Sequence, residues 1–73
     1  MKVVVGKRAY QMSQKEYKGL LEIASEQVPF GVYAIEKQNY AELRNDKCTS
    51  STKLKAMIRQ YNAAGYKVHY NGR

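Results

Sequence analysis

Hydrophobic residues recur with a helical period in two stretches of the chain. In the first stretch, the positions i, i+3, i+4 and i+7 are occupied by Tyr17, Leu20, Leu21 and Ala24. This spacing places the four side chains along one face of a helix, which is the face expected to pack on the core. Ser13 and Glu16 form the Ser-x-x-Glu pattern of a capping box at a helix start, and Pro29 cannot continue a helix. The pattern predicts a helix over residues 14–27.

The second stretch repeats the same spacing with Leu54, Met57, Ile58 and Tyr61. Ser50 or Ser51 suits the N-terminal cap of this helix, because a serine hydroxyl accepts a hydrogen bond from a free backbone N–H. Gly65 stands where a residue in the left-handed conformation commonly ends a helix. We therefore expect a second helix over residues 52–64.

The N-terminal residues predict a β-hairpin. Residues 3–5 are three valines, whose β-branched side chains favour extended structure. Gly6-Lys7 then suits a type II′ turn into a second extended stretch over residues 8–12.

A second hairpin is predicted between the two helices. Residues 32–35 have the composition of a strand, and Gln38-Asn39 can turn the chain into another strand over residues 40–44. A short helix over residues 35–44 is the alternative interpretation. We favour the hairpin.

The last part of the chain alternates strictly between apolar and polar positions. One face of this predicted strand carries Tyr66, Val68 and Tyr70, and the other carries Lys67 and His69. Alternation with a period of two is typical of a strand that is covered on one face.

These elements follow the order ββαββαβ. The order predicts an α+β fold with two helices packed on one face of a three- to five-stranded antiparallel or mixed sheet. Residues 45–51 are expected to form a loop, and residues 71–73 are expected to fray. The chain has 73 residues, which suffices for one domain over residues 1–73 with a single small core.

Basic residues outnumber acidic ones, and the excess lies mostly in the C-terminal half. Thirteen Lys and Arg oppose six Asp and Glu, which gives a formal charge of +7. Residues 1–36 hold five basic and four acidic groups (+1), and residues 37–73 hold eight and two (+6). A positive field favours anionic partners, so we expect the partner to be nucleic acid or an acidic protein surface.

The second predicted helix carries a polar row suited to phosphate groups. Lys55, Arg59 and Asn62 fall at i, i+4 and i+7, away from the apolar face. Such a row can follow a phosphate backbone, where each cationic contact releases a counterion, although a solvated outer helix face is the simpler alternative. Further candidate contacts at the start of this helix are Ser50, Ser51 and Lys53. Free N–H groups at a helix start suit a phosphate, while helix capping alone explains the serines equally well.

Seven of the eight aromatic residues are tyrosines, a bias that core packing does not require. Tyrosine rings beside basic residues can stack on nucleobases. The last predicted strand combines such groups in Tyr66, Lys67, His69 and Tyr70. The same residue types are also enriched in protein-binding surfaces.

The sequence therefore predicts a small non-catalytic module that binds nucleic acid through the second helix, the loop before it and the last strand. The alternative is a protein-interaction module that inhibits or regulates a larger protein, such as one that processes nucleic acid. The last strand, if it lies at a sheet edge, can pair with its copy in a second chain, so a homodimer is expected.

The chain has one cysteine, Cys48, and one histidine, His69. They cannot assemble a zinc-binding set. General acid–base catalysis could use Glu36, Glu42 or His69, but such a pair needs a cleft, which a two-helix domain seldom forms, so we expect no metal, no cofactor and no catalysis. A metal-independent nuclease using His69 and a tyrosine would be the enzyme to test. A lone cysteine forms no internal disulfide, which indicates a cytoplasmic protein, and no stretch approaches the roughly 20 apolar residues that span a bilayer.

Overall fold

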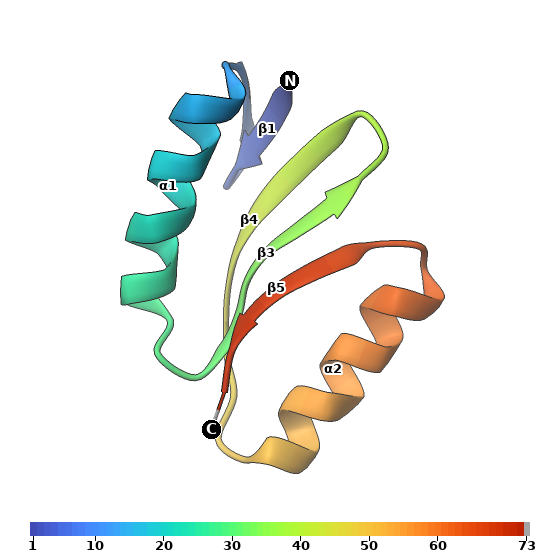
Figure 1. Cartoon of the computed structure of the whole chain (residues 1–73). Helices are drawn as coiled ribbons and strands as arrows, with labels where there is room; N and C mark the ends of the chain where they lie inside the picture. The colour runs from blue at the N-terminus through green and yellow to red at the C-terminus, as the bar shows by residue number, and fades with distance from the viewer. Residues whose placement is uncertain (73) are drawn as a thin grey trace.

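Five strands and two helices alternate in the order ββαββαβ in the computed structural model, which describes residues 1–72 (Figure 1). The elements are β1 (Lys2–Val5), β2 (Arg8–Gln11), α1 (Gln14–Gln27), β3 (Gly31–Lys37), β4 (Tyr40–Lys47), α2 (Ser51–Ala63) and β5 (Lys67–Asn71). The α+β class, the element order and both hairpins are confirmed. The alternative helix over residues 35–44 is therefore wrong.

The strands form one mixed sheet in the order β2-β1-β4-β3-β5. β1 and β4 are parallel, and the other neighbouring strands are antiparallel. β5 and β2 are thus the edge strands of the described sheet. The homodimer expected from pairing of the last strand stays a prediction.

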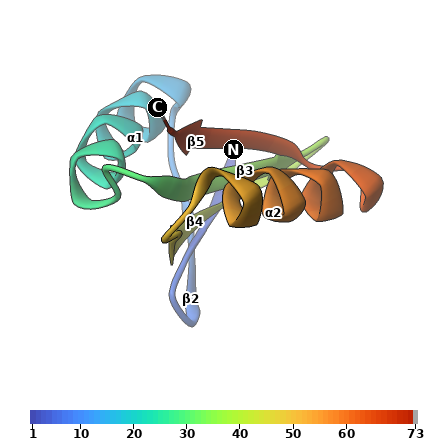
Figure 2. The same cartoon turned by 90° about the horizontal axis from the view of Figure 1, so that it is seen from below.

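The two helices pack on opposite faces of the sheet, so the predicted placement on one face is wrong. Tyr17 of α1 packs in a cluster with Ala41, whereas Leu54 of α2 packs in a cluster with Ile35. Ala41 pairs with Glu36, the neighbour of Ile35 in β3. Successive strand residues point to opposite faces, so the two clusters lie on different sides, and in Figure 2 the strands run between the helices.

The direction of the strands explains this arrangement. The connections β2–α1–β3 and β4–α2–β5 both progress the same way across the sheet, but β2 and β3 run opposite to β4 and β5. A right-handed crossover is strongly favoured in twisted sheets. When two right-handed crossovers move the same way across a sheet but join strands that run in opposite directions, their helices lie on opposite faces.

Two predicted boundaries are corrected by backbone pairing. β4 continues to Lys47, because Gly31 of β3 pairs with Lys47, so residues 45–47 of the expected loop over residues 45–51 are strand. β5 continues through Asn71, whose side-chain amide bonds to the end of α1, so the chain does not fray at this residue. Arg73 lies outside the described residues.

Local signals for turns and caps hold in the structure. Ser13 and Glu16 form both hydrogen bonds of the capping box at the start of α1. Gly6 has a positive φ of 64° in the two-residue turn between β1 and β2, and Lys7 does not, as a type II′ turn requires. Gly65 ends α2 with a φ of 89°. No helix among residues 1–72 is long and apolar enough to cross a membrane.

Candidate functional site

The sheet divides the residues predicted to bind nucleic acid among different surfaces. On the α2 side, Lys55, Arg59 and Asn62 lie beside Tyr70. Lys67 and His69 instead face α1, on the other side of the sheet. β5 is common to both places, because its alternate side chains point to opposite faces.

On the α2 side, an open groove of about 370 Å³ is lined by residues of α2 and β5. We call this surface the α2 groove; its lining residues are Lys55, Ile58, Arg59, Asn62 and Tyr70. Tyr70 is 50% exposed, so its ring is accessible beside the polar row. A smaller hollow of about 220 Å³ adjoins the groove and shares Lys55 and Tyr70 with it.

The charge around the α2 groove is positive because the nearby acidic groups are already paired. α2 itself contains Lys53, Lys55 and Arg59 and no acidic residue. The two acidic residues of the C-terminal half, Glu42 and Asp46, bind Arg44 at 2.6 and 3.0 Å. Their negative charge is therefore balanced locally within β4.

Asp46, which Arg44 holds within β4, also connects this strand to α2. The Tyr61 hydroxyl donates a 2.7 Å hydrogen bond to Asp46. Burial, the hydrogen bond and the negative charge of Asp46 raise the pKa of Tyr61 to about 12. The hydrogen bonds from Arg44 to Asp46 and Glu42 raise the pKa of the guanidinium above its ordinary value. Both groups thus keep their protons, and this network has a structural role under α2.

The predicted contacts at the start of α2 act mainly as a helix cap. The Ser50 hydroxyl accepts a 3.2 Å hydrogen bond from the backbone N–H of Lys53. Ser51 is the first residue of α2 and borders the hollow next to the groove. The capping interpretation thus accounts for Ser50, and neither serine nor Lys53 lines the α2 groove.

Tyr66 is packed against other tyrosines rather than presented for stacking. Its ring lies edge-on to Tyr40 and Tyr61, with centroids 6.5 and 6.0 Å away. The Tyr40 and Tyr66 hydroxyls are 3.0 Å apart, and the Lys37 ammonium lies 4.5 Å from the Tyr66 ring centroid. Of the two tyrosines predicted to stack in the last strand, only Tyr70 is exposed.

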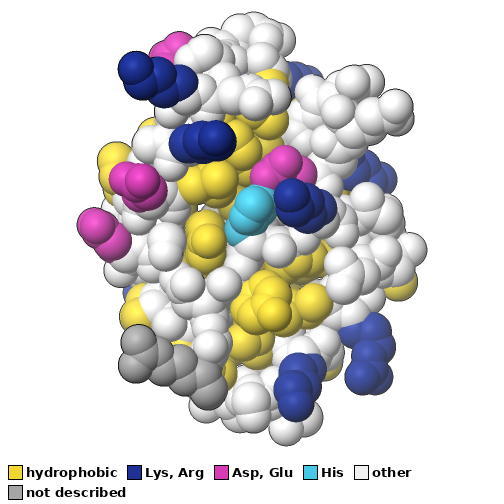
Figure 3. Space-filling view, in the orientation of Figure 1, with side chains coloured by type: hydrophobic (Ala, Val, Ile, Leu, Met, Phe, Trp, Pro, Cys, Tyr) yellow, Lys and Arg dark blue, Asp and Glu magenta, His cyan; other side chains and the backbone are white. Residues whose placement is uncertain are grey.

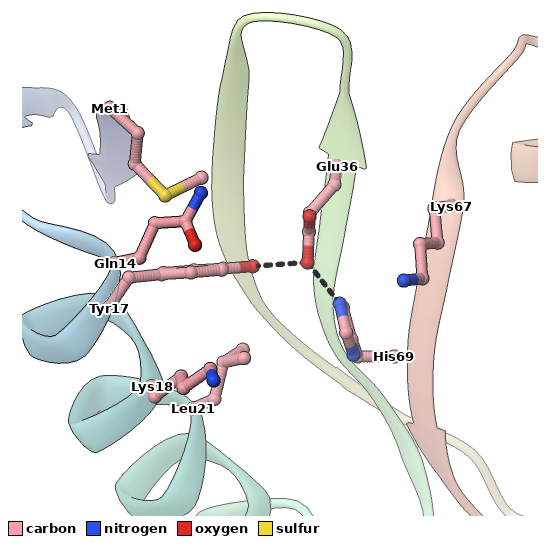
Figure 4. Close-up of a pocket in the computed structure, with 8 residues that line it drawn as sticks. All are labelled: Met1, Gln14, Tyr17, Lys18, Leu21, Glu36, Lys67 and His69. Carbon is pink, nitrogen blue, oxygen red and sulfur yellow. Dashed lines mark hydrogen bonds and ion pairs between the residues drawn. The ribbon is translucent and has the colours of Figure 1, made fainter.

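On the opposite side of the sheet, a cavity of about 290 Å³ lies between α1 and β5. We call it the α1–β5 cavity; it is lined by Met1, Gln14, Tyr17, Lys18, Leu21, Glu36, Lys67 and His69 (Figure 4). Figure 3 shows hydrophobic side chains inside a hollow that is bordered by basic, acidic and histidine side chains.

Glu36 is the centre of a hydrogen-bond network in this cavity. Its Oε2 atom accepts a 2.9 Å hydrogen bond from the Tyr17 hydroxyl and also bonds to Nε2 of His69 (Figure 4). Partial burial favours a higher pKa for Glu36, but hydrogen bonds from His69 and Tyr17 and the charges of His69 and Lys67 lower the pKa overall. Burial, followed by the hydrogen bond and charge of Glu36, raises the pKa of Tyr17. Glu36 is therefore ionised at neutral pH while Tyr17 remains protonated.

The sequence patterns do not predict that Tyr17, Lys18 and Glu36 lie close to Lys67 and His69. Tyr17 was expected in the core, which its 5% exposure confirms, but its hydroxyl still reaches the cavity network. One feature of the sequence that points to this network is Glu36, an acidic residue directly after the apolar run 32–35. A carboxylate at the end of such a strand requires hydrogen-bond donors nearby.

Residues 1–72 contain no group of three or more His, Cys, Asp or Glu side chains that could hold a metal ion. Comparisons of the chain with protein-family models, curated proteins and solved structures found no match.

Proposed function

We propose that this chain is a non-catalytic nucleic-acid-binding module that uses the α2 groove. The observation that carries the proposal is the grouping of Lys55, Arg59 and Asn62 beside the exposed ring of Tyr70. Lysine and arginine contacts to phosphates release counterions, and the asparagine amide can donate to a phosphate or base oxygen.

The position of Tyr70 favours nucleic acid with unpaired bases. Its ring borders an open groove at an edge strand, where a base from a single strand can stack on it. Stacking of this kind tolerates any base, so the α2 groove supports binding with little sequence preference.

The net charge supports the same proposal. The chain carries +7, and the acidic residues nearest α2 are bound to Arg44. A phosphate chain approaching the groove therefore meets uncompensated Lys and Arg charge.

The test is a charge reversal in the groove with a matched reversal elsewhere. Lys55→Glu with Arg59→Glu should abolish binding of a single-stranded oligonucleotide, measured by fluorescence anisotropy. Lys7→Glu with Lys15→Glu changes the net charge equally on exposed positions outside the groove and should weaken binding only modestly. Circular dichroism checks that both variants are folded.

Salt dependence separates phosphate contacts from an apolar interface. Binding by wild type should weaken with rising salt with a log–log slope of several units, and each lost phosphate contact should lower the slope by about 1. Equal loss in the two double variants contradicts a defined site. No oligonucleotide binding by wild type at low salt favours the protein-interaction alternative, in which an acidic protein surface is the partner.

A further inference from the structure

The α1–β5 cavity combines cationic groups from two elements with an apolar wall. Lys18 projects from α1, while Lys67 and His69 project from β5, and all three border the same 290 Å³ space. Figure 4 shows the Lys67 ammonium on the side of the cavity that holds Glu36 and His69. Among residues 1–72, neither Lys18 nor Lys67 is in an ion pair.

The single acidic group of the cavity is already engaged. The Glu36 carboxylate accepts from Tyr17 and His69 through one oxygen, and it balances only one positive charge. Two lysines therefore leave an excess of positive charge in a partly enclosed space, where it attracts an anion more strongly than in open solvent.

The rest of the wall is apolar and shaped by α1. The ring of Tyr17 is almost fully buried at 5% exposure, and Leu21 and the Met1 side chain line the same side. A ligand that filled this cavity would place an organic group against these side chains and an anionic group near the lysines. The volume of about 290 Å³ suits a compact molecule with both parts.

We propose that the α1–β5 cavity binds a phosphomonoester, with the phosphate held by the ammonium groups of Lys18 and Lys67 beside His69. Two ammonium groups from two elements match the two negative charges and three terminal oxygens of a phosphomonoester dianion better than the single charge and two oxygens of a carboxylate. The organic group attached to the phosphate packs on Leu21 and the Tyr17 ring. Glu36 orients the His69 ring through its bond to Nε2.

The phosphomonoester can be a free small molecule or the 5′-phosphate end of a nucleic-acid strand. The second source is compatible with the fold because the cavity and the α2 groove lie on the two sides of β5. In Figure 3, hydrophobic side chains are exposed in two separate areas of the face shown. The phosphomonoester site itself does not rest on nucleic-acid binding by the α2 groove.

The test is a nuclear magnetic resonance titration of the full chain with phenyl phosphate, inorganic phosphate and phenol. Phenyl phosphate should give saturable shifts at the His69 ring and at the Lys18 and Lys67 side chains. Inorganic phosphate should shift the same resonances more weakly, because it lacks the apolar part, and phenol should not shift them.

Substitutions then separate the cavity from general surface charge. Lys18→Gln with Lys67→Gln should weaken phenyl phosphate binding by at least about tenfold, since each removes a charge-assisted hydrogen bond. Lys7→Gln with Lys15→Gln removes the same charge outside the cavity and should bind as wild type. His69→Gln keeps a side-chain donor but lacks the imidazole. It should weaken phenyl phosphate binding less than the Lys18→Gln, Lys67→Gln variant does.

Two oligonucleotides, one with a 5′-phosphate and one with a 5′-hydroxyl, identify the source. They are titrated into the Lys55→Glu, Arg59→Glu variant, which removes the α2 groove from the measurement. If the 5′-phosphate oligonucleotide shifts the cavity resonances and the 5′-hydroxyl oligonucleotide does not, the ligand is a nucleic-acid end. If phenyl phosphate shifts them and neither oligonucleotide does, the ligand is a free small molecule. Absence of saturable cavity shifts with phenyl phosphate, or unchanged affinity in the Lys18→Gln, Lys67→Gln variant, overturns the proposal.

Discussion

The Tyr17 hydroxyl in α1 donates a 2.9 Å hydrogen bond to the Glu36 carboxylate in β3. His69 in β5 bonds to the same carboxylate oxygen, so one side chain links three elements that are far apart in the sequence. The link lies at the wall of the α1–β5 cavity. Its donors and acceptor therefore contribute both to the packing of α1 and to the geometry of the cavity.

Replacing Tyr17 with phenylalanine should lower the free energy of unfolding by about 1–2 kcal/mol. The ring still fills its place in the core, but a partly buried carboxylate loses one of its two donors. Urea denaturation measures this change. Tyr10→Phe, at a 45% exposed position, is the control and should leave stability unchanged; equal stability of the two variants would contradict the role of the Tyr17 hydroxyl.

The Glu36 network should make the protein less stable in acid. The pKa of Glu36 in the folded chain lies below its ordinary value of 4.5, so the folded state favours the ionised form. The resulting stability is present above about pH 4.5 and is lost as the pH falls through the lower, folded-state pKa. Denaturation at a series of pH values should show this decline in wild type and a smaller decline in Glu36→Gln. Parallel pH profiles for the two proteins would show that Glu36 is not responsible.

Gly19→Ala should raise the free energy of unfolding by about 0.5–1 kcal/mol. Gly19 lies inside α1, where glycine is less favourable than alanine, and a β-carbon there would have no neighbour within 4 Å. Gly31→Ala is the opposite case, because Gly31 has a φ of 145° and a β-carbon would overlap the carbonyl oxygen of Asp46. In thermal denaturation, the melting temperature should be highest for Gly19→Ala, intermediate for wild type and lowest for Gly31→Ala. Any other order contradicts these assignments.

Asn71→Ala should destabilise the contact between β5 and α1 by about 1–3 kcal/mol. The Asn71 amide lies 3.0 Å from the Ser25 carbonyl oxygen, 2.9 Å from the Ser25 hydroxyl and 3.0 Å from the Val28 carbonyl oxygen. Its loss leaves partly buried carbonyls without a donor. Hydrogen exchange should show faster opening at the end of α1, and unchanged exchange there would mean that Asn71 does not hold this end.

The local signals in the sequence were sufficient for the elements. Helix periods, the capping box of Ser13 and Glu16, the Gly6 turn and the Gly65 helix end act through neighbours within about one turn of chain, so they can be recognised without the fold. Strand ends were less predictable. β4 runs on to Lys47 because β3 supplies pairing partners, although Asn45 and Asp46 resemble loop residues.

The candidate sites show the same division between local pattern and tertiary structure. The row Lys55, Arg59 and Asn62 was recognisable because its members share one helix face. The placement of Lys67 and Tyr70 on different faces of β5 follows from alternation alone. Which helix each face meets depends on strand order and crossover direction, and these are decided by pairing between distant segments.

The sequence by itself determined the element order, the positive charge and the outer row of α2, because each depends on residue type and short spacing. Only the tertiary structure decided that α1 and α2 cover opposite faces, that Tyr66 packs against Tyr40 and Tyr61, and that Tyr17 meets Glu36 and His69. The reason is physical: contacts between segments 19 to 46 residues apart depend on the sheet order and the direction of each strand. A periodic pattern within one segment carries no information about either.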